Sequence, residues 1–246
     1  MSALVNASRW LLTFACATSL ALLPARAAVL IHEYALQGSL TDRLGGPSLT
    51  SLGGQITGLG YVFAANQGLA FSSPTITTAN YSLEFSIRLD TVAGNRKLLD
   101  FQGLTSNLGV YARGGLMDIV PGTSSGAQII TAGNNAHVVV TRNGTTGVVS
   151  GYVNGQLSFI YTDTTSATIP SGSFRFLVDD NVTTQTEASG GTMNYFRVFN
   201  GVLTQTEVGA LFAGGPPQAV PEPSTYALLS IGGIVMAVTA LRRRRR

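Results

Sequence analysis

The segment from residue 28 to residue 215 consists of short apolar runs separated by turn residues, and this pattern limits the possible folds more than any other feature. Its clearest run is residues 81–90, YSLEFSIRLD, in which apolar and polar residues alternate. Successive side chains of a β-strand point to opposite faces of a sheet. The run therefore predicts a strand of an antiparallel sheet with one buried face and one wet face, and it places Glu84 on the wet face.

Asn-Gly pairs and Gly-rich turns mark the points where the chain reverses. Asn154-Gly155 in VVSGYVNGQLSFIY is the strongest hairpin signal, because both residues tolerate a positive φ. About a dozen short strands without a long periodic helix predict an all-β sandwich or barrel. One helix is expected in LTQTEVGALF, where Thr204 as N-cap and Glu207 form a capping box. Besides 81–90, strands are predicted at 29–34, 68–72, 97–101, 108–112, 116–120, 127–131, 137–142, 148–153, 157–161, 174–178 and 193–199.

The first 27 residues have the composition of a secretory signal peptide. Arg9 precedes an apolar stretch too short to span a bilayer, and Ala25 and Ala27 form an A-x-A cleavage signal. We therefore expect cleavage after Ala27. The alternative, a buried N-terminal helix, requires a polar face that this segment almost entirely lacks. The chain's single cysteine, Cys16, lies within the segment, so the exported product would contain no disulfide.

The basic character of the chain comes from its two ends. The full sequence has 15 Lys and Arg residues against 12 Asp and Glu residues. Arg9, Arg26, the five C-terminal arginines and Glu222 lie outside residues 28–215, which leaves 8 basic and 11 acidic residues and a net charge of about −3. Nucleic-acid binding therefore loses its compositional support, because no basic stripe remains.

The last 27 residues differ sharply from the segment before them. As a helix, the uncharged residues 226–241 would extend about 24 Å, slightly less than a hydrocarbon core of about 30 Å. The arginines that follow would hold the far end in the cytoplasm, so that the domain would lie outside the inner membrane. The parts in order are Val220, Pro221, Glu222, Pro223, Ser224 and Thr225, then the apolar span, then Arg242, Arg243, Arg244, Arg245 and Arg246.

This order of parts resembles the PEP-CTERM sorting signal of Gram-negative bacteria. The resemblance implies an exosortase-type processing enzyme as a partner, a cut near the Pro-Glu-Pro, and only transient contact with the inner membrane. A permanent single-span anchor is the alternative. The expected organisation is a signal peptide at 1–27, a β-domain at 28–215 and a sorting signal at 216–246.

The order of strands in the middle segment resembles the LamG-like domains of the concanavalin A-like superfamily, which are jelly-roll β-sandwiches. The resemblance covers residues 29–213 and includes YSLEFSIRLD, AHVVVTRNGTTGVVSGYVNGQ and GGTMNYFRVFNGVLTQTEVGAL. Members often have Trp before the histidine of the second stretch, where this chain has Ala136, and residues 28–215 contain no Trp. An aromatic platform for stacking on sugars would therefore have to use Tyr or Phe.

The middle segment shows no clear catalytic constellation. We interpret His137, at the start of a predicted strand, as a structural residue with a satisfied hydrogen bond. His32 and its neighbour Glu33 would point to opposite faces of a strand and so could not easily act together. Glu84 and Asp90 would lie roughly 20 Å apart along one strand, too far to flank one glycosidic bond.

Three residues at the end of a predicted strand offer the oxygen ligands that Ca²⁺ prefers: Asp179, Asp180 and Asn181. LamG-like domains often bind calcium at a loop rim, so the resemblance also points to Ca²⁺ as the cofactor to consider. A solvated Asp-Asp-Asn turn without metal is the alternative interpretation.

The sequence favours an exported, non-catalytic β-sandwich that binds glycan or matrix material, or serves as a structural component, at the cell envelope. Besides the processing enzyme, its expected partner is an extracellular polysaccharide or envelope component, and no nucleic acid. Two alternatives stay open: a polysaccharide hydrolase or lyase of the same fold, and a calcium-dependent adhesin.

Overall fold

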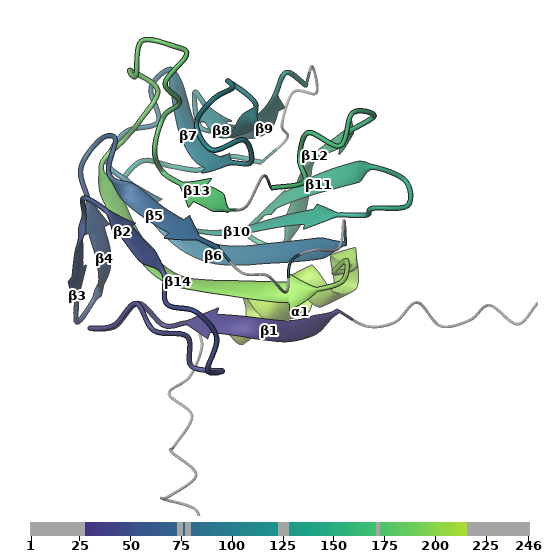
Figure 1. Ribbon diagram of the computed structural model, residues 1–246, viewed down its shortest axis with the longest axis horizontal. Helices are drawn as coiled ribbons and strands as arrows, with labels where there is room; N and C mark the ends of the chain where they lie inside the picture. Colours follow the sequence, from purple (N-terminus) through teal and green to yellow (C-terminus); the bar gives the residue numbers. More distant parts are fainter. Residues whose placement is uncertain (1–27, 73–75, 77–79, 123–127, 171–172, 216–246) are drawn as a thin grey trace, which may run out of the picture.

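Two antiparallel β-sheets face each other in a computed structural model that describes residues 28–72, 76, 80–122, 128–170 and 173–215 (Figure 1). In spatial order, the larger sheet contains β12 (Gln156–Thr162), β11 (Val148–Val153), β10 (Asn135–Arg142), β6 (Tyr81–Leu89), β14 (Gly191–Asn200), β4 (Gly60–Phe63) and β3 (Gln55–Thr57), and β1 (Val29–Tyr34) also pairs with β14. The smaller sheet contains β2 (Thr50–Leu52), β5 (Gly68–Phe71), β13 (Phe174–Phe176), β7 (Asn95–Asp100), β8 (Gly109–Arg113) and β9 (Leu116–Val120). The predicted all-β sandwich is confirmed.

The core lies between the two sheets and is built from the inward residues of the alternating runs. Phe85 of β6 contacts Phe176 of β13 edge to face, with ring centroids 5.6 Å apart, and Phe176 lies 4.7 Å from Phe196 of β14. All three rings are fully buried. Such aromatic pairs stabilise the core beyond the area that they bury.

Strand β14 is central to the larger sheet because its ten residues pair with three other strands. One of its edges pairs with β6 along the whole strand, and the other pairs with β4 near its start and with β1 near its end. The register sets Arg197 of β14 between Glu33 of β1 and Glu84 of β6. These three charged side chains therefore share the outer face of the sheet.

The helix α1 (Gln205–Gly214) lies on this outer face (Figure 1). Its predicted capping box is confirmed: the Thr204 side chain accepts from the Glu207 backbone, and the Glu207 side chain accepts from the Thr204 backbone. Val208 of the helix packs with Val139 and Tyr152 of the sheet. The helix thus covers part of a surface that the sequence pattern assigns to solvent.

The expectation that Glu84 lies on a wet face is wrong. Its side chain is fully buried, because the outer face of β6 is covered by ion-pair partners and by α1. Alternation along a strand predicts only that polar and apolar residues occupy opposite faces. It does not predict whether another element covers the polar face.

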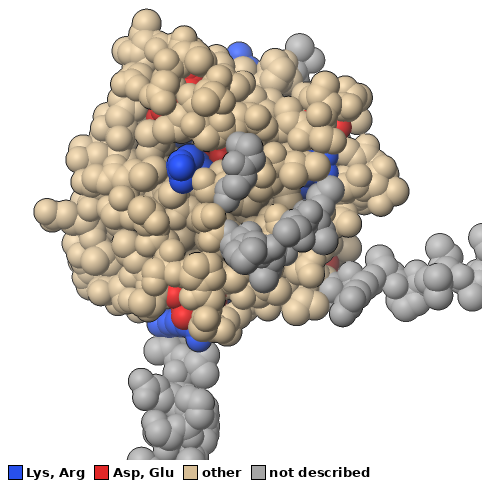
Figure 2. Space-filling model, viewed as in Figure 1, with Lys and Arg blue, Asp and Glu red and all other residues tan. Residues whose placement is uncertain are grey.

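Several other charged side chains also lie inside the molecule rather than on it. The face in Figure 2 shows few Lys, Arg, Asp and Glu side chains, scattered among other residues. Buried charged groups are stable only where they are paired or hydrogen-bonded, so each of them marks a specific local structure. The buried members of this group include Glu33, Asp42, Glu84, Lys97, Asp100, Asp118, Arg142, Asp163, Asp179 and Asp180.

Most predicted strands are present with shifted ends, but two regions differ. The segment GGQITGLG contains β3, and β2 and β4 are further short strands, none of which the pattern predicts. The strand predicted at 127–131 is absent from its described part, where Ile129 makes one isolated bridge to Leu116. The hairpin at Asn154-Gly155 is confirmed, with φ of 50° and 78° at the two residues.

Within the described residues, no helix is long and apolar enough to cross a membrane. The expected signal peptide at 1–27 and the expected apolar span at 226–241 lie outside the described residues.

Candidate functional site

A buried network of charged and polar side chains is centred on Glu84 of β6. Its Oε1 lies 3.0 Å from His137 Nε2 and accepts a hydrogen bond of 3.2 Å from the Tyr195 hydroxyl. Its Oε2 lies 3.3 Å from Nη1 of Arg197, whose Nε donates to Glu33 Oε1 at 2.9 Å. The hydrogen bonds from three neighbouring strands, β10, β14 and β1, hold these side chains in fixed positions.

Tyr195 stays protonated in this network. Burial raises the pKa of its phenol well above the ordinary value, and the neighbouring Glu84 charge raises it further. The hydroxyl can therefore only donate to Glu84, which fixes its orientation.

A groove of about 320 Å³ opens directly above this network. We call it the His137 groove. Its volume lies at the lower end of the roughly 300–1,000 Å³ that is usual for small-ligand sites. Polar residues from β6, β10, β14 and the β11–β12 turn line its floor, namely Ser86, Asn135, His137, Asn154, Asn194 and Tyr195, and Ala35, Leu59 and Phe212 are among its remaining lining residues.

Phe212 of α1 forms an apolar wall of the His137 groove. Its ring centroid lies 5.7 Å from that of His137, and 47% of the residue is exposed. Among the Phe and Tyr residues that the structure describes, it is the one in the exposed class. The turn residue Gly155 permits this position, because a Cβ there would lie 3.2 Å from the Phe212 ring.

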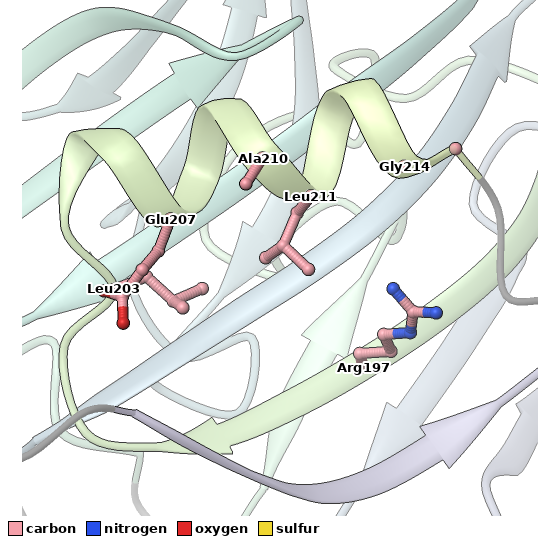
Figure 3. Close-up of a pocket in the computed structure, with 7 residues that line it drawn as sticks. Arg197, Leu203, Glu207, Ala210, Leu211 and Gly214 are labelled. Carbon is pink, nitrogen blue, oxygen red and sulfur yellow. The ribbon is translucent and has the colours of Figure 1, made fainter.

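A second groove, of about 450 Å³, lies between α1 and β14 (Figure 3). Leu203, Ala210 and Leu211 give it an apolar lining, and Arg197 lies at its base. The Arg197 guanidinium is already held by Glu33 and Glu84, and Glu207 is committed to the helix cap. This Arg197 groove is larger but offers fewer uncommitted polar groups than the His137 groove, so we regard the latter as the candidate site.

His137 is therefore a structural residue that also lines the groove. The expected satisfied hydrogen bond exists at Nε2, but Nδ1 has no hydrogen-bond partner among the described residues. The sequence alone did not bring His137 together with Glu84, because the two are far apart in the chain and only the β6–β10 register makes them neighbours. His32 is placed elsewhere: its Nδ1 lies 2.6 Å from Asp42 Oδ2, whereas its neighbour Glu33 binds Arg197 on the outer face.

Two of the three residues suggested as calcium ligands lie beside a third carboxylate. Carboxylate oxygens of Asp179, Asp180 and Glu187 lie within 4.8 Å of one another. The Oδ1 of Asn181 accepts from Gln185 Nε2 at 2.8 Å. Glu187 was missed because no ligand spacing in the sequence links it to the Asp-Asp pair; the chain folds back to bring it there.

Groups of the protein itself already form ion pairs or hydrogen bonds with Asp179 and Asp180. Lys97 Nζ lies 2.8 Å from Asp180 Oδ2 and 3.4 Å from Asp100 Oδ2, with all three side chains buried. Burial opposes the charged form of Asp180, but the hydrogen bonds from Lys97 and Thr183 outweigh it and lower the pKa. The two carboxylate oxygens of Asp179 accept from the backbone of Asp180 and Glu187. These contacts favour the alternative of a turn without metal, but the two aspartates are buried, so the expectation that the turn is solvated is wrong.

The remaining residues suggested from the sequence lie outside the described part of the chain. They are the cleavage residues Ala25 and Ala27, the sorting motif at 220–225 and the arginines at 242–246.

The fold and the comparisons together define a concanavalin A-like β-sandwich. The chain belongs to the concanavalin A-like lectin/glucanases superfamily, since the Laminin_G_3 family matches residues 63–209. The PEP-CTERM protein-sorting motif matches residues 219–246. This motif implies export, sorting to the envelope or surface, and processing by an exosortase-type system. The comparison with curated proteins found no match.

Solved structures with the same fold come from proteins of several kinds. Domain 4 of AbnA, a GH43 extracellular arabinanase from Geobacillus stearothermophilus solved with arabinotriose, has a TM-score of 0.59 at 19% identity, over 75% of this chain and 98% of that one. A Trypanosoma rangeli sialidase has a TM-score of 0.59 at 19% identity, over 77% of this chain. Botulinum neurotoxin type C, which interacts with two ganglioside molecules, has a TM-score of 0.56 at 16% identity, over 76% of this chain. The match spans only 33% of the sialidase chain and 51% of the neurotoxin chain.

Proposed function

We propose that this protein is an exported, non-catalytic binding module that holds a glycan in the His137 groove at the cell envelope or in the extracellular matrix. One observation carries the proposal: a floor of neutral polar side chains lies beside the exposed ring of Phe212. The structural neighbours solved with arabinotriose or described with gangliosides support it by analogy of fold alone.

The chemistry of the groove suits a sugar. A sugar ring has an apolar face and a rim of hydroxyl groups, so it needs an apolar wall and several directional hydrogen-bonding groups. Phe212 supplies the wall, and Ser86, Asn154 and Asn194 are among the residues that supply hydrogen-bonding groups. With no Trp in residues 28–215, the stacking role falls to Phe212.

Binding is favoured over hydrolysis in this groove. Glycoside hydrolases generally use two carboxyl groups, separated by about 5 to 9.5 Å, on either side of the scissile bond. None of the described residues that line the His137 groove is Asp or Glu, and Glu84 beneath it is engaged by His137, Tyr195 and Arg197. A hydrolase or lyase would therefore have to use another part of the molecule.

The sorting motif indicates how the domain would reach the envelope or the extracellular matrix. We expect the exosortase-type enzyme to release the domain from its apolar tail, which would leave it with an extracellular polysaccharide or envelope component as its partner. Without that cut, the tail would keep the domain anchored at the inner membrane. In either case the groove would be available outside the cytoplasm.

Replacing Phe212 tests the function. We expect Phe212→Ala to weaken binding to a responsive glycan by about tenfold or more, because it removes the stacking wall. The assay screens purified residues 28–219 against a polysaccharide panel and then titrates the best ligand calorimetrically. Ile160→Ala is the matched control, since Ile160 is a 55% exposed apolar residue that does not line the groove.

Two results would contradict the proposal. Equal loss of affinity in Phe212→Ala and Ile160→Ala would place binding outside the groove. Release of reducing ends during incubation with the panel would show that the module is a hydrolase or lyase.

A further inference from the structure

We infer that the His137 groove selects uncharged, hydroxyl-bearing glycans and rejects sugars that carry a carboxylate or sulfate. The inference rests on the proposed function and deepens it, because it names the class of glycan. It depends on the hydrogen-bond polarity of two residues in the groove, His137 and Asn194, and on the charges around them.

The polarity of His137 is fixed by its neighbour. Nε2 lies 3.0 Å from a carboxylate oxygen of Glu84, and a carboxylate can only accept, so Nε2 carries the hydrogen. In the neutral imidazole the other nitrogen is then an acceptor. Nδ1 has no hydrogen-bond partner within the described chain, and the residue is only 7% exposed. Nδ1 is therefore a buried acceptor in a residue that lines the groove.

The polarity of Asn194 is fixed in the same way. Its amide nitrogen donates to the Leu59 carbonyl oxygen at 3.1 Å, and a carbonyl oxygen can only accept. The amide of Asn194 therefore cannot be reversed without loss of this bond. Its Oδ1 is buried and also has no hydrogen-bond partner in the described part of the chain. Two residues that line the groove thus each carry a buried acceptor of defined polarity.

The charges near the groove disfavour an anion. No Lys or Arg is among the described residues that line it, and the nearby Arg197 is held by Glu33 and Glu84. The Glu84 carboxylate lies directly beneath His137. An anionic ligand would therefore meet no compensating cation and would lie close to a buried negative group.

A hydroxyl group matches this floor and a carboxylate does not. A hydroxyl can donate to His137 Nδ1 or Asn194 Oδ1 and can accept from the amide nitrogen of Asn154, whose Oδ1 is already used by the His137 backbone. A carboxylate or sulfate can only accept, so it makes neither of these hydrogen bonds. The hydrogen bonds that only the hydroxyl can make should favour it by roughly tenfold, which corresponds to about 1.4 kcal/mol.

The test compares two oligosaccharides of the same length and linkage, one neutral and one whose C6 hydroxymethyl groups are oxidised to carboxylates. The exported protein is titrated calorimetrically with each at pH 8. We expect the neutral oligosaccharide to bind about tenfold or more tightly than the oxidised one. Asn135→Arg adds a cation at an exposed lining position and should reduce this difference to roughly threefold or less.

The controls separate this inference from the proposed function. Arg substituted for Gln128, which lies outside the groove, adds the same charge elsewhere and should leave the preference unchanged. If both oligosaccharides bind equally and both lose affinity in Phe212→Ala, the glycan site stands and the selectivity is refuted. If neither binds in a manner that depends on Phe212, the proposed function fails, and the selectivity fails with it.

Discussion

At the scale of single residues, Glu84 links the fold to the candidate site. It orients His137 on one side and accepts from Tyr195 and Arg197 on the other. The same contacts that let a carboxylate remain in the sheet also set the polarity of the groove floor. We therefore expect Glu84 to contribute both to the stability of the fold and to ligand recognition in the groove.

We expect Glu84→Ala to lower the free energy of unfolding by about 3 kcal/mol, because it leaves buried groups of Arg197 and His137 without their partner. Urea unfolding followed by circular dichroism measures the change. Asp90→Asn is the matched control on the segment that follows β6: its pair with Arg88 is exposed, so its loss should cost less than about 1 kcal/mol. Equal losses in the two variants would contradict the assigned role of Glu84.

These residues were only partly predictable from the sequence. The local pattern indicated that His137 is structural and that a sugar platform would need Tyr or Phe. It did not single out Phe212 or pair Glu84 with His137. The first depends on where α1 packs on the larger sheet and the second on the register between β6 and β10, and such contacts between distant segments leave no short-range pattern.

At the scale of elements, the loop between β13 and β14 contains acidic side chains whose charges and oxygens are already bound by groups of the protein. Lys97 reaches it from β7 and binds Asp180, while backbone groups of the loop bind Asp179 and Asp180. A protein-borne cation therefore neutralises part of the charge that a metal ion would otherwise balance.

We expect millimolar Ca²⁺ to leave the melting temperature of the protein unchanged, because the oxygens of Asp179 and Asp180 already have partners. Thermal melts with increasing calcium measure this, since an ion that binds only the folded state must raise the melting temperature. Magnesium at equal concentration controls for ionic strength. A rise specific to calcium would overturn the expectation and support the calcium-dependent adhesin.

Elements with local signals were predictable, and elements without them were not. Thr204 and Glu207 form their capping box within one helical turn, so four neighbouring residues are enough to predict the start of α1. The short β2, β3 and β4 have too few residues to show alternation. Pairing of β2 with β5, of β4 with β14 and of β3 with β4 supplies the order that their sequences lack.

At the scale of the whole molecule, stability should depend on carboxylates that are kept ionised inside the fold. Burial opposes the charge of Asp163, but hydrogen bonds from the Thr168 side chain and from the backbone of Thr165, Ala167 and Thr168 outweigh it and lower the pKa from 3.8 to about 2. Similar bonds lower the pKa of Asp42 and Asp180.

A depressed pKa means that the unfolded chain binds more protons than the folded one, so stability is lost as the pH falls from about 4 to about 2. For Asp163 the loss is roughly 2 kcal/mol. Urea unfolding between pH 5 and pH 2 measures it, and Asp163→Asn should lose correspondingly less over that range. Asp90→Asn, which removes an exposed carboxylate, is the control variant. Parallel curves for all three proteins would contradict the assignment.

By itself the sequence determined the class of fold, the capped helix and the sorting motif, because each is encoded in neighbouring residues: alternation in strands, four residues in a cap, three parts in order at the C-terminal end. Only the tertiary structure decided that Glu84 is buried, that Phe212 stands beside His137, and that Glu187 joins the Asp179–Asp180 pair. Those outcomes depend on strand register and on where α1 docks, which are set by packing between segments far apart in the chain.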